Sequence, residues 1–269
     1  MDLTLSSDLY NNLKFNMHKL ILDLAEDNYI RLAAIFGADE KEVKQFLDEF
    51  HHTCTEEAEE LKKAVQIPDI KKIKTFAFVG DSITSDRESY LNIFKEYFKG
   101  QPEIKIVDAA ISGDKSDDAR MKFYFRVMNH KPDVVHILLG TNDMRQNADI
   151  NGEPSVSLQD YQRNLEYMVS KLKSENVDII LSTIPPVDNQ GLRKRFPDDY
   201  WIYDTRNIAE VNKIIADIAK RYQVKLNDMG PEYERYLPEE ILLADGLHLN
   251  RTGQKLLAQK LLKAFIEFV

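Results

Sequence analysis

From residue 70 onward, short apolar runs alternate with longer amphipathic stretches. The apolar runs, each of which predicts a strand, lie at 75–79, 104–109, 134–139, 178–183 and 224–226. The stretches between and after them have helical spacing and lie at 86–98, 115–129, 158–174, 204–221 and 251–268. Apolar strands that alternate with helices indicate a parallel sheet covered on both faces. We therefore expect an α/β fold for this part of the chain.

The beginning of the chain has a different pattern, with helical spacing only. Apolar residues recur there on one helical face: Leu13, Met17, Leu20, Ile21 and Leu24. Asp39 is a suitable N-cap for a second helix, and Thr53 with Glu56 has the spacing of a capping box at the start of a third. A short link comes after this third helix. We expect two parts, a small all-helical segment at 1–67 and a main domain at 70–269.

Charge and cysteine content exclude several classes of protein. The chain has 269 residues, a net charge of −9 and a pI of about 5.3. Phosphate backbones and anionic membrane surfaces repel an acidic protein, so nucleic acid is not an expected partner. No apolar run reaches the length of a membrane span, and the N-terminus lacks the pattern of a secretory signal. Cys54 is the only cysteine, which excludes a disulfide within the chain, and we expect a cytoplasmic protein.

Polar motifs stand directly after the predicted strands. Ligands bind at this place in such sheets, beyond the carboxyl ends of the strands. The first motif is Gly-Asp-Ser-Ile-Thr at 80–84. Ser82 stands where a helix begins, with its hydroxyl at the edge of the sheet and its backbone N–H unpaired, which suits a developing oxyanion. Read alone, the motif favours a serine that only caps the helix.

The next two strands are followed by Ile-Ser-Gly-Asp at 111–114 and by Gly-Thr-Asn-Asp at 140–143. Gly113 allows its N–H to approach a ligand closely. Asn142 offers a side-chain N–H donor at the same edge. Read alone, each of these motifs favours an ordinary turn.

Near the C-terminus, Asp245 precedes His248 by three residues. At this spacing the carboxylate can fold back onto the imidazole, accept the proton on Nδ1 and hold one tautomer. Read alone, the pair is equally an exposed histidine in a loop. His51, His52 and Cys54 are too clustered and too isolated to suggest a zinc site, so we expect no metal.

The four motifs occur in order, each after a predicted strand or in the C-terminal loop. With this series, the chain from about residue 73 to its end resembles the SGNH hydrolases, also called GDSL esterases and lipases. The resemblance implies a three-layer α/β/α, flavodoxin-like sandwich with a five-stranded parallel sheet. The elbow G-x-S-x-G is absent, which argues against the α/β-hydrolase fold. Family members often have asparagine on the second strand, where this chain has Asp108.

The resemblance also implies roles for individual residues. Ser82 would be the nucleophile, His248 the general base and then the general acid, and Asp245 the residue that orients the imidazole. The oxyanion hole would consist of the N–H groups of Ser82 and Gly113 and the side chain of Asn142. This chemistry needs no cofactor, and the expected partner is a small-molecule ester.

The substrate is less constrained than the reaction. We expect a small or medium acyl ester; a carbohydrate O-acetyl ester, a lysophospholipid and a thioester are alternatives. A long stretch from Pro185 to Tyr203 comes after the fourth predicted strand and has the position of a binding loop. Trp201 and Tyr203 are candidates for substrate binding there, although their rings could equally pack on the next helix.

Two other hypotheses stay open. A binding module that keeps the fold without catalysis would be expected to lack the serine, asparagine or histidine, and this chain has all three. The helices at 1–67 could instead cap the active site, form a homo-oligomer interface, bind a partner, or pack against the main domain.

Overall fold

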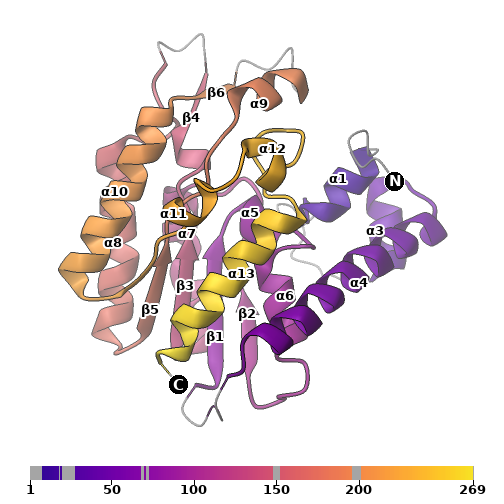
Figure 1. Ribbon diagram of the computed structural model, residues 1–269, viewed down its shortest axis with the longest axis horizontal. Helices are drawn as coiled ribbons and strands as arrows, with labels where there is room; N and C mark the ends of the chain where they lie inside the picture. Colours follow the sequence, from indigo (N-terminus) through magenta and orange to yellow (C-terminus); the bar gives the residue numbers. More distant parts are fainter. Residues whose placement is uncertain are drawn as a thin grey trace.

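The computed structural model describes residues 8–17, 19, 28–67, 70, 73–147, 152–195 and 201–268. A five-stranded parallel sheet in the order β2-β1-β3-β5-β7 forms its centre (Figure 1). The strands are β1 (Thr75–Gly80), β2 (Lys105–Asp108), β3 (Val134–Leu138), β5 (Asp178–Ser182) and β7 (Lys225–Asn227). The predicted parallel sheet is therefore confirmed, with strand boundaries that agree with the prediction to within one residue.

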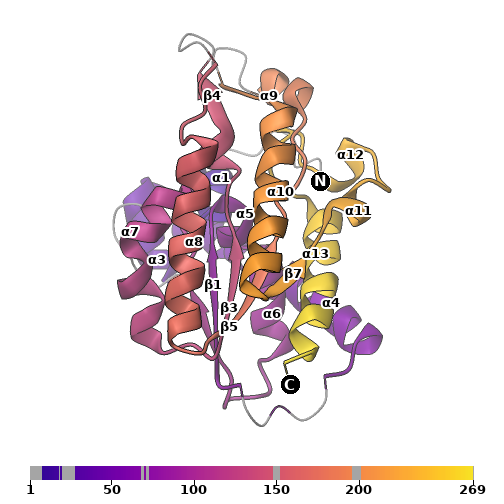
Figure 2. The same cartoon turned by 90° about the vertical axis from the view of Figure 1, so that its left-hand side faces the viewer.

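Helices cover both faces of this sheet (Figures 1 and 2). On one face lie α6 (Tyr90–Tyr97) and α13 (Arg251–Ile266), and on the other lie α7 (Ser116–Arg126), α8 (Leu158–Ser174) and α10 (Thr205–Tyr222). The expected three-layer α/β/α sandwich is confirmed. No helix of the described residues combines the length and the apolar character that crossing a membrane requires.

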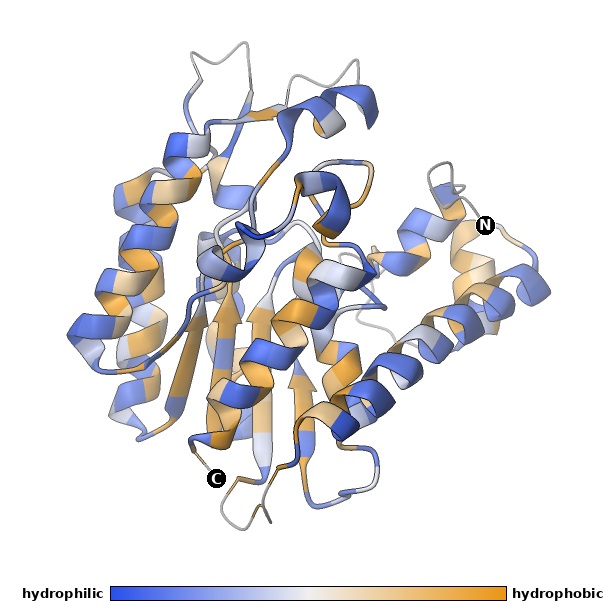
Figure 3. Ribbon diagram, in the orientation of Figure 1, coloured by the Kyte–Doolittle hydropathy of each residue, from blue (hydrophilic) through white to orange (hydrophobic). Residues whose placement is uncertain are grey.

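The side chains of β1 show why both faces are covered. Phe76 and Phe78 point into the core beneath α6 and α13, where Phe76 stacks on Phe265 with ring centroids 4.9 Å apart. Ala77 and Val79 point into the second core beneath α7, α8 and α10. Since neighbouring residues of a strand face opposite sides, a strand buried on both sides is apolar throughout. Figure 3 accordingly shows hydrophobic residues concentrated in the strands.

The N-terminal helices are α1 (Asp8–Lys14), α3 (Tyr29–Phe36) and α4 (Glu40–Ala64). The longest of them, α4, packs along α6. Cys54, Ala58 and Leu61 of α4 belong to the same buried cluster as α6 and α13. Glu57 of α4 is also ion-paired with Lys255 of α13 at 3.0 Å. One face of α4 thus contributes to the main core, while Figure 3 shows its outer face to be hydrophilic.

Two predictions for this part are wrong. No helix begins at Thr53, whose hydroxyl donates to Glu49 O at 3.2 Å within the continuous helix α4. The first helix ends at Lys14, and Asn16 has the left-handed φ of 50°, so the helical face does not continue through Met17. Leu20, Ile21 and Leu24, and part of the predicted link, lie outside the described residues.

The helix predicted at 86–98 begins later than expected. A short helix, α5 (Ser82–Ser85), precedes it, and α6 starts only at Tyr90. Between them the Asp86 side chain accepts from Glu88 N at 2.8 Å, and Asp86 O accepts from Ser89 N at 3.0 Å. An aspartate that bonds the backbone two residues ahead favours a turn over a helix.

A small antiparallel sheet was not predicted. β4 (Arg145–Asn147) pairs with β6 (Trp201–Tyr203), and α9 (Asn189–Arg195) lies in the stretch that was expected to be a loop. Strands of three residues have too short a pattern to be seen in the sequence. Their pairing joins segments that lie far apart in the chain.

Candidate active site

The turn after β1 carries Ser82 at the carboxyl end of the central strands, where Figure 1 shows α5. Asp81 is the N-cap of α5, and its carboxylate accepts from Ile83 N at 2.9 Å. Ser82 is the first residue of the helix and does not cap it. Its hydroxyl is therefore available for a partner on another element.

That partner is His248, which lies 166 residues further along the chain. His248 Nε2 is 2.8 Å from Ser82 Oγ, and His248 Nδ1 is 2.7 Å from Asp245 Oδ2. A serine, a histidine and a carboxylate in series is the arrangement that activates a serine hydroxyl. The structure thus brings the three predicted side chains into one hydrogen-bonded chain.

Hydrogen bonds between the Asp245 carboxylate and backbone N–H groups hold the loop that carries His248. Asp245 Oδ1 accepts from Leu247 N at 2.9 Å and from His248 N at 3.0 Å, so the carboxylate is fixed by two donors besides the imidazole. Gly246 has a φ of 68°, and a Cβ there would lie 2.2 Å from Asp188 O. Only glycine fits this turn without a clash. Asp188 N in turn donates to Gly246 O at 2.7 Å.

The surroundings shift the pKa values of His248 and Asp245. Burial lowers the pKa of His248, but the charge and hydrogen bond of Asp245 outweigh it, and the pKa of the imidazole stands above its ordinary value of 6.5. Burial raises the pKa of Asp245, but His248 and the two backbone donors outweigh it, and the net pKa is below 3.8. Asp245 is therefore ionised at neutral pH, and it favours the charged imidazolium that a general base becomes.

The two predicted donor loops adjoin the nucleophile turn. Ile111 N donates to Gly80 O at 3.1 Å, and Asn142 Nδ2 donates to Asp114 O at 3.1 Å. Gly113 lies between these contacts with a φ of 84° and is exposed. The loops that carry Ser82, Gly113 and Asn142 are thus linked side by side at one edge of the sheet.

Tyr203 and Trp201 differ in their surroundings. Tyr203 is buried, and its hydroxyl has no hydrogen-bond partner among the described residues. Burial raises the pKa of Tyr203 above its ordinary value; the charge of Arg145 opposes this shift, and the charges of Asp81 and Asp245 add to it. Trp201 is half-buried, with the Arg145 guanidinium 4.5 Å above its ring.

One aromatic residue next to the site was not predicted. The ring of Phe15 stacks on the His248 imidazole with centroids 4.1 Å apart and an angle of 28° between the planes. Phe15 comes directly after α1, and both views show α1 close to α5 (Figures 1 and 2). No motif in the sequence surrounds Phe15, so only the folded chain reveals this contact.

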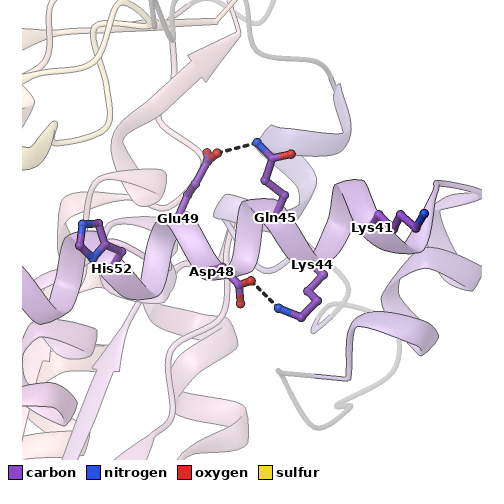
Figure 4. Close-up of a pocket in the computed structure, with 6 residues that line it drawn as sticks. All are labelled: Lys41, Lys44, Gln45, Asp48, Glu49 and His52. Atoms are coloured by element: carbon purple, nitrogen blue, oxygen red, sulfur yellow. Dashed lines mark hydrogen bonds and ion pairs between the residues drawn. The ribbon is translucent and has the colours of Figure 1, made fainter.

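A hollow elsewhere on the surface has no comparable chemistry. It lies on the outer face of α4, has a volume of about 400 Å³ and is lined by Lys41, Lys44, Gln45, Asp48, Glu49 and His52 (Figure 4). Within it Lys44 pairs with Asp48, and Gln45 Nε2 donates to Glu49 at 2.9 Å. The lining comes from one exposed helix, and these side chains pair with each other. No cluster of histidine, cysteine and carboxylate side chains suited to a metal ion occurs among the described residues.

Comparisons with known proteins identify a family that the chain matches and solved structures with a similar fold. A profile of the GDSL-like lipase/acylhydrolase family matches residues 78–256. An uncharacterized lipoprotein of Bacillus subtilis is 29% identical over 150 residues, which cover 52% of this chain and 60% of that protein. A GDSL esterase/lipase of Arabidopsis thaliana is 30% identical over 148 residues, which cover 51% of this chain and 59% of that protein.

A solved structure shares the three-layer architecture. The lipase/acylhydrolase from Enterococcus faecalis superposes with a TM-score of 0.59 at 25% identity, covering 73% of this chain and 97% of that one. The chain spans only about 60% of the length of the Bacillus and Arabidopsis relatives. The family profile nevertheless covers well over half of the chain, which therefore belongs to the GDSL-like lipase/acylhydrolase family.

Proposed function

We propose that this protein is a serine hydrolase that cleaves carboxylic esters through an acyl-enzyme intermediate. The observation that carries the proposal is the hydrogen-bonded chain from Asp245 through His248 to Ser82, with contacts of 2.7 and 2.8 Å. Membership of the lipase/acylhydrolase family supports the same reaction class.

In the first step, Ser82 Oγ attacks the carbonyl carbon of the ester while His248 Nε2 takes the hydroxyl proton. A C–O bond forms and the carbonyl π electrons move to the oxygen, which becomes an oxyanion. Collapse of this intermediate breaks the bond to the leaving alcohol, and His248 returns the proton to the leaving oxygen. Asp245 stays ionised and stabilises the imidazolium throughout.

In the second step, water takes the place of the alcohol. His248 removes a proton from water, the hydroxide attacks the acyl carbon, and the bond to Ser82 Oγ breaks as the proton returns to serine. The products are a carboxylic acid and the free enzyme. The side chains of the triad and water account for every proton and electron pair in this cycle.

The oxyanion needs donors that are in place before the charge appears. We propose the N–H groups of Ser82 and Gly113 and the side chain of Asn142 for this role. Their support is the linkage of the three loops through Ile111 N to Gly80 O and Asn142 to Asp114 O. Fixed donors stabilise the transition state more than mobile water does, because they need no reorganisation during the reaction.

For the substrate we propose a small or medium acyl ester; carbohydrate O-acetyl esters, lysophospholipids and thioesters are alternatives within the same chemistry. Tyr203 is proposed as a substrate contact, because its buried hydroxyl lacks a protein partner among the described residues. The support for Trp201 is weaker, since its ring already stacks with Arg145.

The first experiment measures hydrolysis of the p-nitrophenyl esters of acetate, butyrate and octanoate. We expect turnover of at least one ester, and its loss in Ser82→Ala and after treatment with phenylmethylsulfonyl fluoride. Ser85→Ala is the matched control, because Ser85 lies in the same short helix and its hydroxyl has no partner among the described residues. Equal slow rates for the wild type and Ser82→Ala would contradict the proposal and favour a non-catalytic binding module.

Location and assembly stay predictions from the sequence. We propose a cytoplasmic protein; the Bacillus relative is named as a lipoprotein, so cell fractionation is the direct test. A homo-oligomer through the helices at 1–67 is tested by light scattering of the purified protein. A monomer at all accessible concentrations would exclude it.

A further inference from the structure

The N-terminal segment reaches the proposed active site at one residue. Phe15 stacks on His248 with ring centroids 4.1 Å apart, and only 9% of Phe15 is exposed. The His248 side chain is itself 14% exposed. A phenyl ring therefore shields one face of the imidazole that would act as base and acid.

The loop after β2 and the short helix that carries Ser82 hold Phe15 in this position. Ser112 Oγ donates to Phe15 O, and Ser112 precedes the proposed oxyanion donor Gly113. The next residue, Asn16, donates through Nδ2 to Ser85 O at 2.6 Å. The left-handed φ of Asn16, 50°, ends α1 and directs the chain across these loops. Two hydrogen bonds, one with the loop after β2 and one with helix α5, thus fix Phe15 and its neighbour.

A buried ion pair holds the residue before it. Lys14 Nζ lies 3.0 Å from Asp86 Oδ1 and also contacts Glu88. Burial lowers the pKa of Lys14, but the two carboxylates outweigh it and raise the pKa above its ordinary value, so the amine stays charged. Arg87 N donates to Lys14 O at 2.8 Å, and Arg87 Nε donates to Leu13 O at 3.0 Å. Breaking such a pair leaves a buried charge, so the segment is firmly attached.

A second ion pair involves Asp108, the position on the second strand at which family members often have asparagine. Lys19 Nζ lies 2.7 Å from Asp108 Oδ2, at the end of β2. Both side chains are largely buried. An asparagine at this position would be neutral and could not balance the charge of Lys19. Asp108 Oδ2 also lies 3.4 Å from Lys95 Nζ of α6, so the aspartate balances one amine from the N-terminal segment and one from the main domain.

We propose that Phe15 is a specificity-determining residue of the active site, whose ring limits the size of the alcohol that leaves. This inference rests on the proposed ester hydrolysis. His248 must donate its proton to the leaving oxygen, so that oxygen has to lie beside Nε2. The Phe15 ring, stacked on the same imidazole, then lies next to the organic group of the leaving alcohol. A compact alcohol fits beside the phenyl ring, and a bulky one meets it.

The test compares two acetate esters that differ only in the alcohol, phenyl acetate and 1-naphthyl acetate. In Phe15→Ala, we expect the ratio of kcat/KM for the naphthyl ester to kcat/KM for the phenyl ester to rise about tenfold relative to the wild type. Phe15→Leu keeps an apolar side chain and should give a smaller rise. The ratio of p-nitrophenyl octanoate to p-nitrophenyl acetate should stay unchanged in both variants.

Phe46→Ala is the matched control, because Phe46 is also an aromatic residue of the N-terminal segment. Its ring packs on Tyr10, with ring centroids 5.3 Å apart, and not on His248. Its ester ratios should equal those of the wild type. A uniform fall for all esters in the Phe15 variants would show that the ring only supports the fold and would overturn the inference. A change confined to the acyl series would overturn the assignment to the alcohol. If the wild type hydrolysed no ester and a fluorophosphonate failed to label Ser82, the proposed function would fail as well.

Discussion

Two opposing effects act on the His248 imidazole. Burial disfavours its charged form, whereas the adjacent Asp245 carboxylate favours it, and the carboxylate prevails. The neutral imidazole is the form that accepts a proton from serine. Activity should therefore rise with pH, with a midpoint above the ordinary pKa of 6.5.

Asp245→Asn removes the largest of the effects that raise the pKa of His248 and leaves the burial that lowers it. We expect the midpoint of the kcat/KM profile to shift to lower pH and turnover to fall by about 10⁴-fold, because an amide also fails to hold the imidazole tautomer. The measurement is kcat/KM for a p-nitrophenyl ester from about pH 5 to 9. A midpoint unchanged from the wild type would mean that Asp245 does not control this titration.

Asn142→Ala tests one proposed oxyanion donor. We expect turnover to fall by about 100- to 1,000-fold, because the charge on the oxygen appears only in the transition state. Asn164→Ala is the control: Asn164 is buried in helix α8 and donates through Nδ2 to Ser116 Oγ, at the start of helix α7, at 3.0 Å. If both variants lost activity equally, loop disorder would be the cause, and the role of Asn142 would be refuted.

At the scale of elements, helix α13 starts directly after the loop of His248. Asn250 caps it, accepting from Gly253 N at 3.1 Å and donating through Nδ2 to Leu242 O at 3.1 Å. This one side chain connects the start of α13 to the residue after α12 (Pro238–Ile241). The position of His248 therefore depends on a helix cap two residues away.

Asn250→Ala should lower the free energy of unfolding by about 1 kcal/mol, the usual cost of a lost N-cap. It should also lower kcat by about tenfold, since small displacements of a catalytic group slow a reaction. Urea unfolding and ester kinetics measure the two effects. Asp39→Ala removes the cap of α4, an exposed residue that accepts from Lys41 N at 2.9 Å, and should reduce stability alone. If Asn250→Ala and Asp39→Ala had the same kcat, the cap at Asn250 would not contribute to positioning His248.

At the scale of the whole molecule, α4 shares a core with the layers of the α/β/α sandwich. Leu61 is 2% exposed and belongs to the cluster that contains Leu257 and Leu261 of α13. Trp201, the only tryptophan, lies in β6, in the main domain. Its fluorescence therefore reports on unfolding of the α/β part.

Leu61→Ala should lower the stability measured by Trp201 fluorescence by about 2–5 kcal/mol, because it leaves a cavity in a shared core. Denaturant titration gives the value. Val43→Ala is the comparison, since Val43 is buried in a separate cluster formed by α1, α3 and α4. If Leu61→Ala left the free energy of unfolding measured by Trp201 fluorescence unchanged, the N-terminal helices would fold independently of the main domain.

Local patterns determined the parallel sheet and the edge at which the chemistry gathers. Apolar runs define strands because each strand is buried on both faces, and turn residues mark the polar loops between a strand and the next helix. The Asp-x-x-His spacing alone does not select the histidine; the order of the motifs and the resemblance to the SGNH hydrolases did, and they gave His248. Asp-x-x-His occurs at Asp48–His51, Asp133–His136 and Asp245–His248, all with one spacing.

The folded chain gives these three pairs different surroundings. Asp48 pairs with Lys44 on an exposed helix, and Asp133 accepts from Lys74 N at 2.7 Å while His136 points into the core, 2.7 Å from Ser182 Oγ. His248 alone among the three has Ser82 beside it. Phe15 likewise reaches its neighbours across 97 residues to Ser112 and further still to His248. Such contacts depend on how whole elements pack, and no window of neighbouring residues encodes that packing. The sequence therefore predicted the reaction class but not the contact between Phe15 and His248.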